Sequence, residues 1–257
     1  MTRQAGRKCA VSLLVVFLMA SCAEEQEPAG KRRPADPAPE DRPVAVRSLK
    51  SPSFHSTLPR VFTDICWDPH KVCFMLINDE AMAEFFMAKG TILAKSFISS
   101  TGKYSLRGWT FVAGKSCVID GASMTVQLSI SRRKTKTFPL NAGDSPSALT
   151  WDGTRLWSAD SGTNRLYKHA GEAEQFRVVD SFPAAGKRVC GLAWDGARLW
   201  SCDSDRLFVY DKDMTAAASY LLPVHVSGIT WRGRELWASD RDEPAIHKIE
   251  IPLGEGH

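Results

Sequence analysis

The stretch that decides the fold is LTWDGTRLWSAD, residues Leu149–Asp160, because the chain repeats it twice more. The copies are LAWDGARLWSCD at Leu192–Asp203 and ITWRGRELWASD at Ile229–Asp240. The first Trp residues of the three units are Trp151, Trp194 and Trp231, which gives spacings of 43 and 37 residues. A period near 40 residues, with four short strand candidates in each unit, is typical of a β-propeller blade.

Each copy reads as two strands joined by a tight turn, followed by two more strands. In the second copy, Val189–Trp194 alternates as an inner strand and an Asp-Gly pair supplies the turn. Arg198–Cys202 returns as the next strand, and Leu207–Tyr210 and Ala218–Leu222 complete the unit. The repeat therefore predicts a four-stranded sheet.

The repeated Trp and Asp residues invite a functional interpretation, as a stacking platform or as metal ligands. In a propeller, however, each sheet packs against its neighbours on both faces, so rings at fixed repeat positions are expected in the core. One Asp per repeat also places these carboxylates far apart. We therefore predict that Asp160, Asp203 and Asp240 accept hydrogen bonds from turn amides.

Three repeats cannot close a ring, since propellers need at least about four blades. Weaker copies lie upstream: Ile65–Asp68 aligns with Ile229–Arg232, and Trp109 lies midway between Trp67 and Trp151. Clear repeats over 145–257 and degenerate repeats over 59–144 predict an all-β propeller with five blades of about 40 residues. The last blade lacks its fourth strand, and residues near 44–58 are predicted to supply it.

An alternative architecture stays open for residues 60–140. Residues 78–89 have helix-forming composition, with a candidate N-cap at Asn78 or Asp79. In this alternative they belong to a separate α+β or β-sandwich module, which three propeller-like repeats follow. A propeller fragment exposes the unpaired sides of its terminal blades, which is an aggregation hazard, and this favours the closed ring.

Residues 1–22 resemble the signal peptide and lipobox of bacterial lipoproteins. Three basic residues precede an apolar run, Ala10–Ala20, which is shorter than the roughly 20 residues of a membrane-spanning helix. The run ends in LMASC, with Cys22 last. The resemblance implies cleavage before Cys22 and acylation of that residue, which anchors the protein in the bilayer. Ala23 implies sorting to the bacterial outer membrane, facing the periplasm or the cell surface; the alternative is an ordinary secretory signal.

Residues 23–43 are rich in Pro and in charged residues without apolar periodicity, which predicts a disordered tether. The propeller domain is accordingly predicted over 44–257. The whole chain carries a net charge of +4, and because residues 1–22 hold three basic and no acidic residues, the mature chain carries +1. A nearly neutral domain without a basic stripe gives no electrostatic reason to bind nucleic acid.

The segment ALTWDGTRLWSADSGTNRLY, residues Ala148–Tyr167, resembles blades of NHL-like and glutamine-cyclotransferase-like propellers. The resemblance covers residues 145–250 and, more faintly, 59–75. It implies the fold, but such propellers include lyases, lactonases, cyclotransferases and binding scaffolds. No residue cluster of this chain matches a catalytic set of those families, so no catalytic residue follows from the resemblance.

Cysteines of a periplasmic domain are expected to pair, because that compartment is oxidising. If Leu192 lies opposite Trp200 in the second repeat, the same register sets Cys190 opposite Cys202, and these two can form a disulfide. The pairing of Cys66, Cys73 and Cys117 stays open. None of the cysteines has the C-x-x-C spacing of a zinc site.

Ligands of propellers usually bind at the central channel, near the starts of the inner strands. The sequence predicts these positions to be Asp64, Ser105, Ser147, Cys190 and Ser227. Only Asp64 carries a charge, so it is the candidate ligand-binding residue, but one carboxylate does not hold a metal ion. The chain has no H-x-x-H, H-E-x-x-H, G-x-S-x-G or glycine-rich phosphate motif, and we predict no catalytic residue, metal or cofactor.

These observations predict an envelope lipoprotein, anchored through Cys22, whose propeller is a scaffold that binds an envelope protein or another envelope component and is not an enzyme. The alternative is a propeller enzyme, resembling a hydrolase, lyase or cyclotransferase, that acts on a small molecule or peptide at the channel. The two differ at the channel mouth. Three or more converging acidic, Asn or His groups favour the enzyme, whereas a smooth channel of small residues with an apolar patch on its rim favours the binding scaffold.

Overall fold

Each repeat of the sequence forms the first hairpin of a β-sheet.

The structure is a computed structural model, and it describes residues 41–50, 62–77, 81–88, 91–99, 105–131, 134–243 and 245–251. Residues 1–40, with the predicted signal peptide, Cys22 and most of the tether, lie outside the described residues. No helix in the described part of the chain is long and apolar enough to cross a bilayer.

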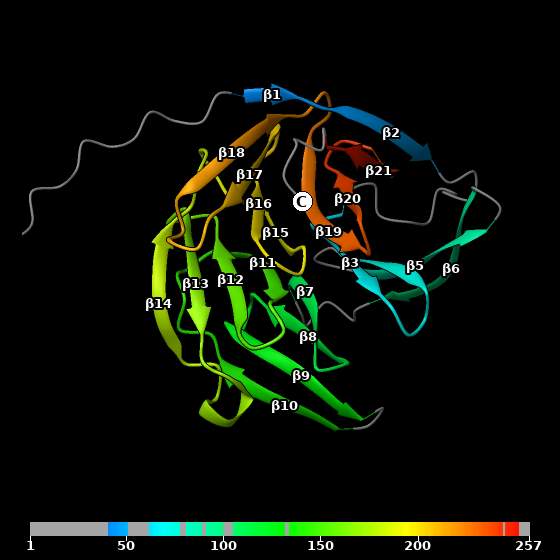
Figure 1. The fold of residues 1–257 in the computed structure, drawn as a ribbon. Coiled ribbons are helices and arrows are strands. Elements are labelled where there is room, and N and C mark those ends of the chain that lie inside the picture. Colours follow the sequence, from blue (N-terminus) through cyan, green and yellow to red (C-terminus); the bar gives the residue numbers. More distant parts are fainter. Residues whose placement is uncertain are drawn as a thin grey trace, which may run out of the picture. The chain divides into compact units, whose positions relative to one another are not determined.

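The described strands form five β-sheets, which Figure 1 shows around a common centre. The first sheet consists, from its inner edge outward, of β3 (Asp64–Asp68), β4 (Cys73–Ile77), β5 (Ala81–Ala88) and β6 (Thr91–Ser99). The second consists of β7 (Leu106–Val112), β8 (Lys115–Asp120), β9 (Thr125–Ser131) and β10 (Lys134–Pro139).

The three clear repeats form the remaining sheets. The third sheet consists of β11 (Pro146–Trp151), β12 (Leu156–Asp160), β13 (Arg165–His169) and β14 (Val178–Pro183), with a short 3-10 helix, η1 (Glu172–Glu174), before β14. The fourth contains β15 (Gly191–Trp194), β16 (Leu199–Cys202), β17 (Arg206–Tyr210) and β18 (Ala216–Leu221). The fifth begins with β19 (Val226–Arg232), β20 (Glu235–Asp240) and β21 (Ala245–Glu250).

The innermost strands form a closed ring. Strand β3 contacts β7, β7 contacts β11, β11 contacts β15, β15 contacts β19, and β19 returns to β3. The fold is therefore an all-β propeller, as predicted. The alternative of a separate α+β or β-sandwich module over 60–140 is wrong, because β3 and β7 belong to the ring. The helix predicted at 78–89 is also wrong: its residues 81–88 form β5, since pairing with β4 and β6 outweighs a weak helix preference.

The N-terminal part of the domain completes the last sheet. Strand β2 (Ala45–Lys50) pairs antiparallel with β21, which confirms the prediction that residues near 44–58 supply this outer strand. Strand β1 (Asp41–Pro43), blue in Figure 1, falls within the segment predicted as tether. It pairs parallel with β18, which is orange in that figure. His247, buried on β21, lies 2.9 Å from Ser48 Oγ through Nδ1 and 2.6 Å from Asp240 Oδ2 through Nε2. Side-chain hydrogen bonds thus reinforce the backbone pairing that joins the two ends of the domain.

The Trp-Asp-Gly…Leu-Trp unit is held together by its own aspartate. Asp195 Oδ1 accepts the amides of Ala197 and Arg198 at 2.7 and 2.6 Å, and its Oδ2 accepts Trp200 Nε1 at 2.7 Å. Asp152 makes the same three bonds one repeat earlier. The third copy has Arg in place of this Asp, and a glutamate two residues before the Trp accepts its indole N–H instead. In the first two copies, one aspartate carboxylate thus accepts hydrogen bonds both from the amides of the hairpin turn and from the indole of the buried Trp.

The second Trp of each repeat lies in the core, as predicted, whereas the first, Trp151, Trp194 or Trp231, is only partly buried. Trp157, Trp200 and Trp237 are 4%, 2% and 1% exposed. Trp200 of the fourth sheet packs in one cluster with Ile229 and Leu236 of the fifth, so the ring is buried between neighbouring sheets. Burying one such ring removes about 150–250 Å² from water, which makes these residues a main source of sheet-to-sheet stability.

Glycines allow the inner strands to approach one another closely. A Cβ atom on Gly108 of β7 would lie 2.3 Å from the backbone nitrogen of Leu149 on β11. A Cβ atom on Gly228 of β19 would lie 2.8 Å from Asp64 Cα on β3. Both contacts are with backbone atoms, so no side chain fits at these positions unless a neighbouring strand shifts.

Candidate functional site

A cavity of about 400 Å³ opens at the end of the ring where the inner strands begin. Residues from all five sheets line it. Five of them hold equivalent places, four residues before the last aromatic residue of each inner strand, and these are Thr63, Arg107, Ser147, Cys190 and Ser227. The cavity is therefore the mouth of the channel at which a ligand was predicted.

The predicted channel positions fit the structure in three sheets without change. Ser147, Cys190 and Ser227 line the cavity, and so does Ser105 of the second sheet. In the first sheet, the residue that lines the cavity is Thr63, and the next residue, Asp64, is buried in the core.

Asp64, the predicted ligand-binding candidate, is 1% exposed. Its Oδ2 accepts the backbone N–H of Trp109 at 2.8 Å, and its side chain fills the space above Gly228. Burial raises the pKa of the Asp64 carboxyl well above its usual range, although the backbone amides of Trp109 and Ile65 act in the opposite direction. Within the structure this carboxyl links β3 to β7.

In the second sheet, the repeat lies two residues later in the sequence than predicted. Phe111, and not Trp109, occupies the place of the first Trp of the repeat, since Phe111 pairs with Ser116 beside the hairpin turn as Trp231 pairs with Leu236. The residue four positions before Phe111 is an arginine, number 107. Alignment of this repeat on Trp109 places Ser105 at the channel instead, and for this reason Arg107 was not predicted to line it.

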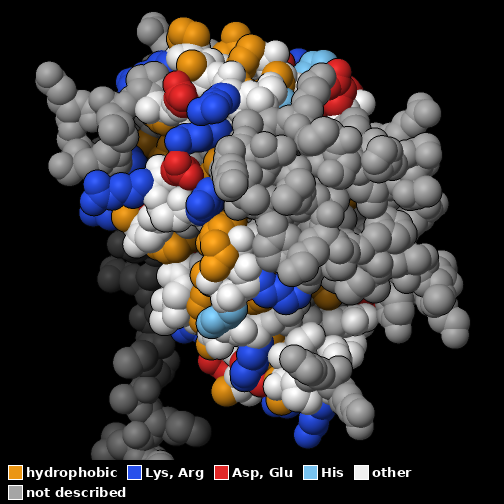
Figure 2. Space-filling view, turned by 90° about the vertical axis from the view of Figure 1, so that its right-hand side faces the viewer, with side chains coloured by type: hydrophobic (Ala, Val, Ile, Leu, Met, Phe, Trp, Pro, Cys, Tyr) orange, Lys and Arg blue, Asp and Glu red, His pale blue; other side chains and the backbone are white. Residues whose placement is uncertain are grey.

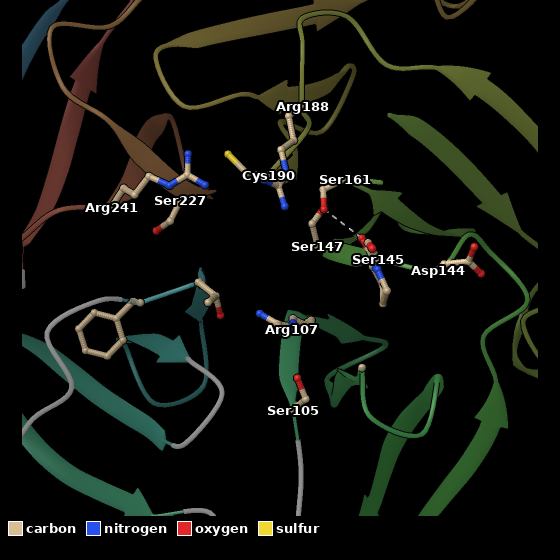
Figure 3. A pocket seen from close by; sticks show the side chains of 14 residues that line it. Ser105, Arg107, Asp144, Ser145, Ser147, Ser161, Arg188, Cys190, Ser227 and Arg241 are labelled. Carbon is tan, nitrogen blue, oxygen red and sulfur yellow. Dashed lines mark hydrogen bonds between the residues drawn. The ribbon is translucent and has the colours of Figure 1, made fainter. Parts of the chain in front are cut away.

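Three arginines point into the cavity, and they come from different sheets (Figure 3). They are Arg107 at the start of β7, Arg188 before β15 and Arg241 directly after β20. Among the described residues, neither Arg188 nor Arg241 forms an ion pair with a carboxylate. Asp144 is the acidic residue of the wall, and in Figure 3 its side chain points away from the centre. Because an arginine stays charged at any pH at which a protein is folded, the cavity is cationic.

Serine side chains fill the wall between the arginines. Ser147 Oγ donates to the carbonyl of Val189 at 3.0 Å, and Ser161 Oγ donates to the carbonyl of Ser145 at 3.2 Å, the dashed line in Figure 3. Ser227 Oγ lies 2.8 Å from Ser239 Oγ. These hydroxyls mainly hold neighbouring strands and loops, so the guanidinium groups are the principal donors that a ligand meets.

The repeated aspartates hold the loops that carry the cavity wall. Asp160 Oδ2 accepts the amide of Ser145, and its Oδ1 accepts an amide in the turn after β12. Asp203 Oδ2 accepts the amide of Lys187, the neighbour of Arg188, at 3.2 Å. The aspartates therefore accept backbone amides, as predicted, and they position the rim of the cavity.

Cys190 and Cys202 lie together in the fourth sheet, with their Sγ atoms 3.5 Å apart. The predicted register is wrong by one residue, since Leu192 pairs with Ser201 and not with Trp200. The backbone N–H of Cys190 nevertheless donates to the carbonyl of Cys202 at 2.8 Å, which keeps the two side chains adjacent. Both are free thiols here, and burial raises the pKa of the Cys202 thiol well above its usual range. The disulfide stays a prediction.

We expect Cys190 and Cys202 to form a disulfide when the protein is treated with oxidised glutathione. The two thiols lose two protons and two electrons as their S–S bond forms, and glutathione disulfide is reduced to two thiols. Peptide mapping after alkylation should find the cross-linked pair in the wild type and in Cys117→Ser, the control at a buried thiol of another sheet. A protein in which both cysteines remain alkylatable would contradict this prediction.

The described residues also line a second hollow, of about 390 Å³, but four carboxylates and no arginine or lysine line it: Asp205, Asp240, Asp242 and Glu243. In Figure 2, the described Lys and Arg side chains lie between acidic and uncharged ones. The exposed large hydrophobic side chains among the described residues are isolated ones, Val72, Val179 and Leu221. Within the described ranges, no group of three or more His, Cys, Asp or Glu side chains could hold a metal ion.

No protein-family model matches the chain, and no curated protein matches it in sequence. Among solved structures, the glutaminyl cyclase of Myxococcus xanthus is similar, with a TM-score of 0.62 and 12% identity over 84% of this chain and 100% of that one. A calcium-binding regucalcin of Agrobacterium tumefaciens has a TM-score of 0.55 and 13% identity, over 82% and 96% of the two chains. A streptogramin B lyase has a TM-score of 0.52 and 9% identity, over 81% and 98%. These similarities show the propeller fold that the sequence resemblance implied; the neighbours include enzymes and a binding protein, so the fold does not select a function.

Proposed function

We propose that this protein is an envelope lipoprotein that binds a ligand in the cavity at the channel mouth and releases it unchanged. The observation that carries the proposal is the composition of the cavity wall. Guanidinium and hydroxyl groups converge there from different sheets, and such groups hold and orient a ligand. General acid–base catalysis instead needs a group that gains and loses a proton near neutral pH, which neither an arginine nor a serine supplies alone.

The size and support of the cavity agree with a binding role. Its volume of about 400 Å³ lies in the range of small-molecule sites. Its wall is carried by the ring of inner strands and by loops that the repeated aspartates fix, so the site is formed before a ligand arrives. The ligand is accordingly a small envelope component, or a protruding group of a larger one.

We also propose that an acylated Cys22 anchors this domain in the outer membrane, with the propeller in the periplasm. The support is the LMASC pattern and the Ala that follows it. Pro-rich linkers reach about 3.1 Å per residue, so a domain anchored through a linker of this composition can meet ligands well away from the bilayer surface.

The test is to incubate the full chain, purified from membranes in detergent, with small molecules extracted from the same envelopes. Bound and free molecules are then separated and identified by mass spectrometry. We expect the wild type to retain a molecule without changing it. Ser145→Trp, which fills the rim of the cavity, should lose that molecule, whereas Thr154→Trp, at an exposed hairpin turn at the opposite end of the sheet, should keep it.

Two results would overturn the proposed function. New products that appear with the wild type and not with Ser145→Trp would support the alternative, a propeller enzyme acting at the same cavity. Equal retention by the wild type and Ser145→Trp would place the ligand site elsewhere.

A further inference from the structure

We infer that the ligand of the cavity is a small oxyanion with two or more negative charges, carried by carboxylate or phosphate groups. This inference rests on the proposed function and specifies the chemistry of its ligand. It follows from three features of the cavity. Its arginines converge, the backbones of these arginines are held by hydrogen bonds, and its serine hydroxyl groups already donate to backbone carbonyls.

The arginines converge without a matching set of carboxylates in the wall. Arg107, Arg188 and Arg241 belong to the second, fourth and fifth sheets and point toward one space (Figure 3). The acidic residue of the wall, Asp144, points away from that space. Like charges in a concave site repel one another, and a bound anion reverses that repulsion. A cavity of this composition therefore favours anions over neutral or cationic ligands.

The backbones that carry two of these arginines are fixed by the repeat itself. The amide next to Arg188 donates to Asp203, and the amide of Arg241 donates to the carbonyl of His225 at 2.9 Å. Gly186 crosses above Asp203 at a φ of +81°, where an added Cβ would lie 2.4 Å from Asp203 Oδ2. Because their backbones are held in place, binding a ligand orders only the ends of these side chains.

The number of charges follows from the donors that remain. Ser147 and Ser161 donate their hydroxyl protons to backbone carbonyls, so they act toward a ligand mainly as acceptors. Each guanidinium has five N–H donors and binds one carboxylate or phosphate group through two parallel hydrogen bonds. Arg188 and Arg241, which form no ion pair among the described residues, approach from different sheets and are best satisfied together by a ligand with two or more anionic groups. A molecule the size of citrate or pyrophosphate fits a cavity of about 400 Å³.

The experiment is isothermal titration calorimetry of the full chain in detergent, with citrate, pyrophosphate and glucose as separate probes. We expect citrate, pyrophosphate or both to bind, more weakly as the salt concentration rises, and glucose not to bind. Arg188→Gln and Arg241→Gln should each weaken that binding by about tenfold or more, since each removes charged hydrogen bonds. Arg234→Gln should have no effect, because it removes the same charge from an exposed turn at the opposite end of β19.

The outcomes separate this inference from the proposed function. Binding of citrate alone identifies carboxylates, binding of pyrophosphate alone identifies phosphates, and binding of both identifies charge as the main determinant. If neither anion binds while Ser145→Trp still abolishes retention of an envelope molecule, the anion inference is wrong and the proposed function stands. Anion binding that both Arg188→Gln and Arg241→Gln retain at wild-type strength also overturns the inference, because the anion then binds outside the cavity.

Discussion

Gly108→Ala is expected to lower the free energy of unfolding by about 3 kcal/mol or more, which is a large fraction of the roughly 5–15 kcal/mol that stabilises a typical domain. The new Cβ atom would lie 2.3 Å from Leu149 N and 2.4 Å from Ala148 C. These are backbone atoms of β11, and β11 is itself fixed in the ring by β15. Strands β7 and β11 must therefore separate at the centre of the molecule. Urea denaturation followed by Trp fluorescence measures the change.

The matched control is Gly171→Ala, which adds the same methyl group. A Cβ atom on Gly171 would meet no other atom within 4 Å, and its φ of −70° is open to any residue. We expect this variant to be as stable as the wild type, or more stable by about 0.4–1 kcal/mol, because alanine restricts the unfolded chain. Equal stability of the two variants would mean that the inner strands do not pack as the ring requires.

Cys22→Ser is expected to abolish lipid attachment and to move the protein from the membrane to the soluble fraction. The predicted anchor includes an acyl chain on the thiol of Cys22, and membrane binding grows by about 0.8 kcal/mol per buried methylene. Growth with an alkyne-tagged fatty acid, followed by fluorophore coupling, should label the wild type and leave Cys22→Ser unlabelled.

Cys9→Ser is the control for this labelling, because Cys9 lies in the segment that the predicted cleavage removes. It should leave both the label and the membrane fractionation unchanged. A wild-type protein without the label, recovered in the soluble fraction, would support an ordinary secretory signal and contradict the anchor.

The fold could be predicted because the hydrogen bonds that define the repeat join residues close together in the sequence. The aspartate of the Trp-Asp-Gly turn finds all three of its partners within five residues, so turn, acceptor and core ring appear together as a motif. The outer strand β2 was predicted from the missing fourth strand of the last sheet. The second sheet was misaligned because it has neither the Trp nor the Asp: Phe111 and Val112 stand in their places.

The cationic cavity was not predicted, because Arg107 lies in the repeat that was misaligned, and Arg188 and Arg241 occupy positions that the repeats do not share. Arg188 and Arg241 lie more than 50 residues apart in the sequence, and only closure of the ring brings them to one space. The sequence did carry a signal for them. Arg241 directly follows the last Asp of its repeat, and Arg188 stands two residues before the predicted channel position Cys190. Comparing the residues that flank each repeat at this end would have exposed both.

A crystal structure of the protein grown with whichever of citrate or pyrophosphate binds in solution tests the anion site most directly. We predict electron density for the anion inside the cavity, with its oxygen atoms within about 2.7–3.1 Å of guanidinium nitrogens of Arg107, Arg188 and Arg241. An anion bound elsewhere on the propeller, with only water between the three arginines, would show that this cavity is not the anion-binding site.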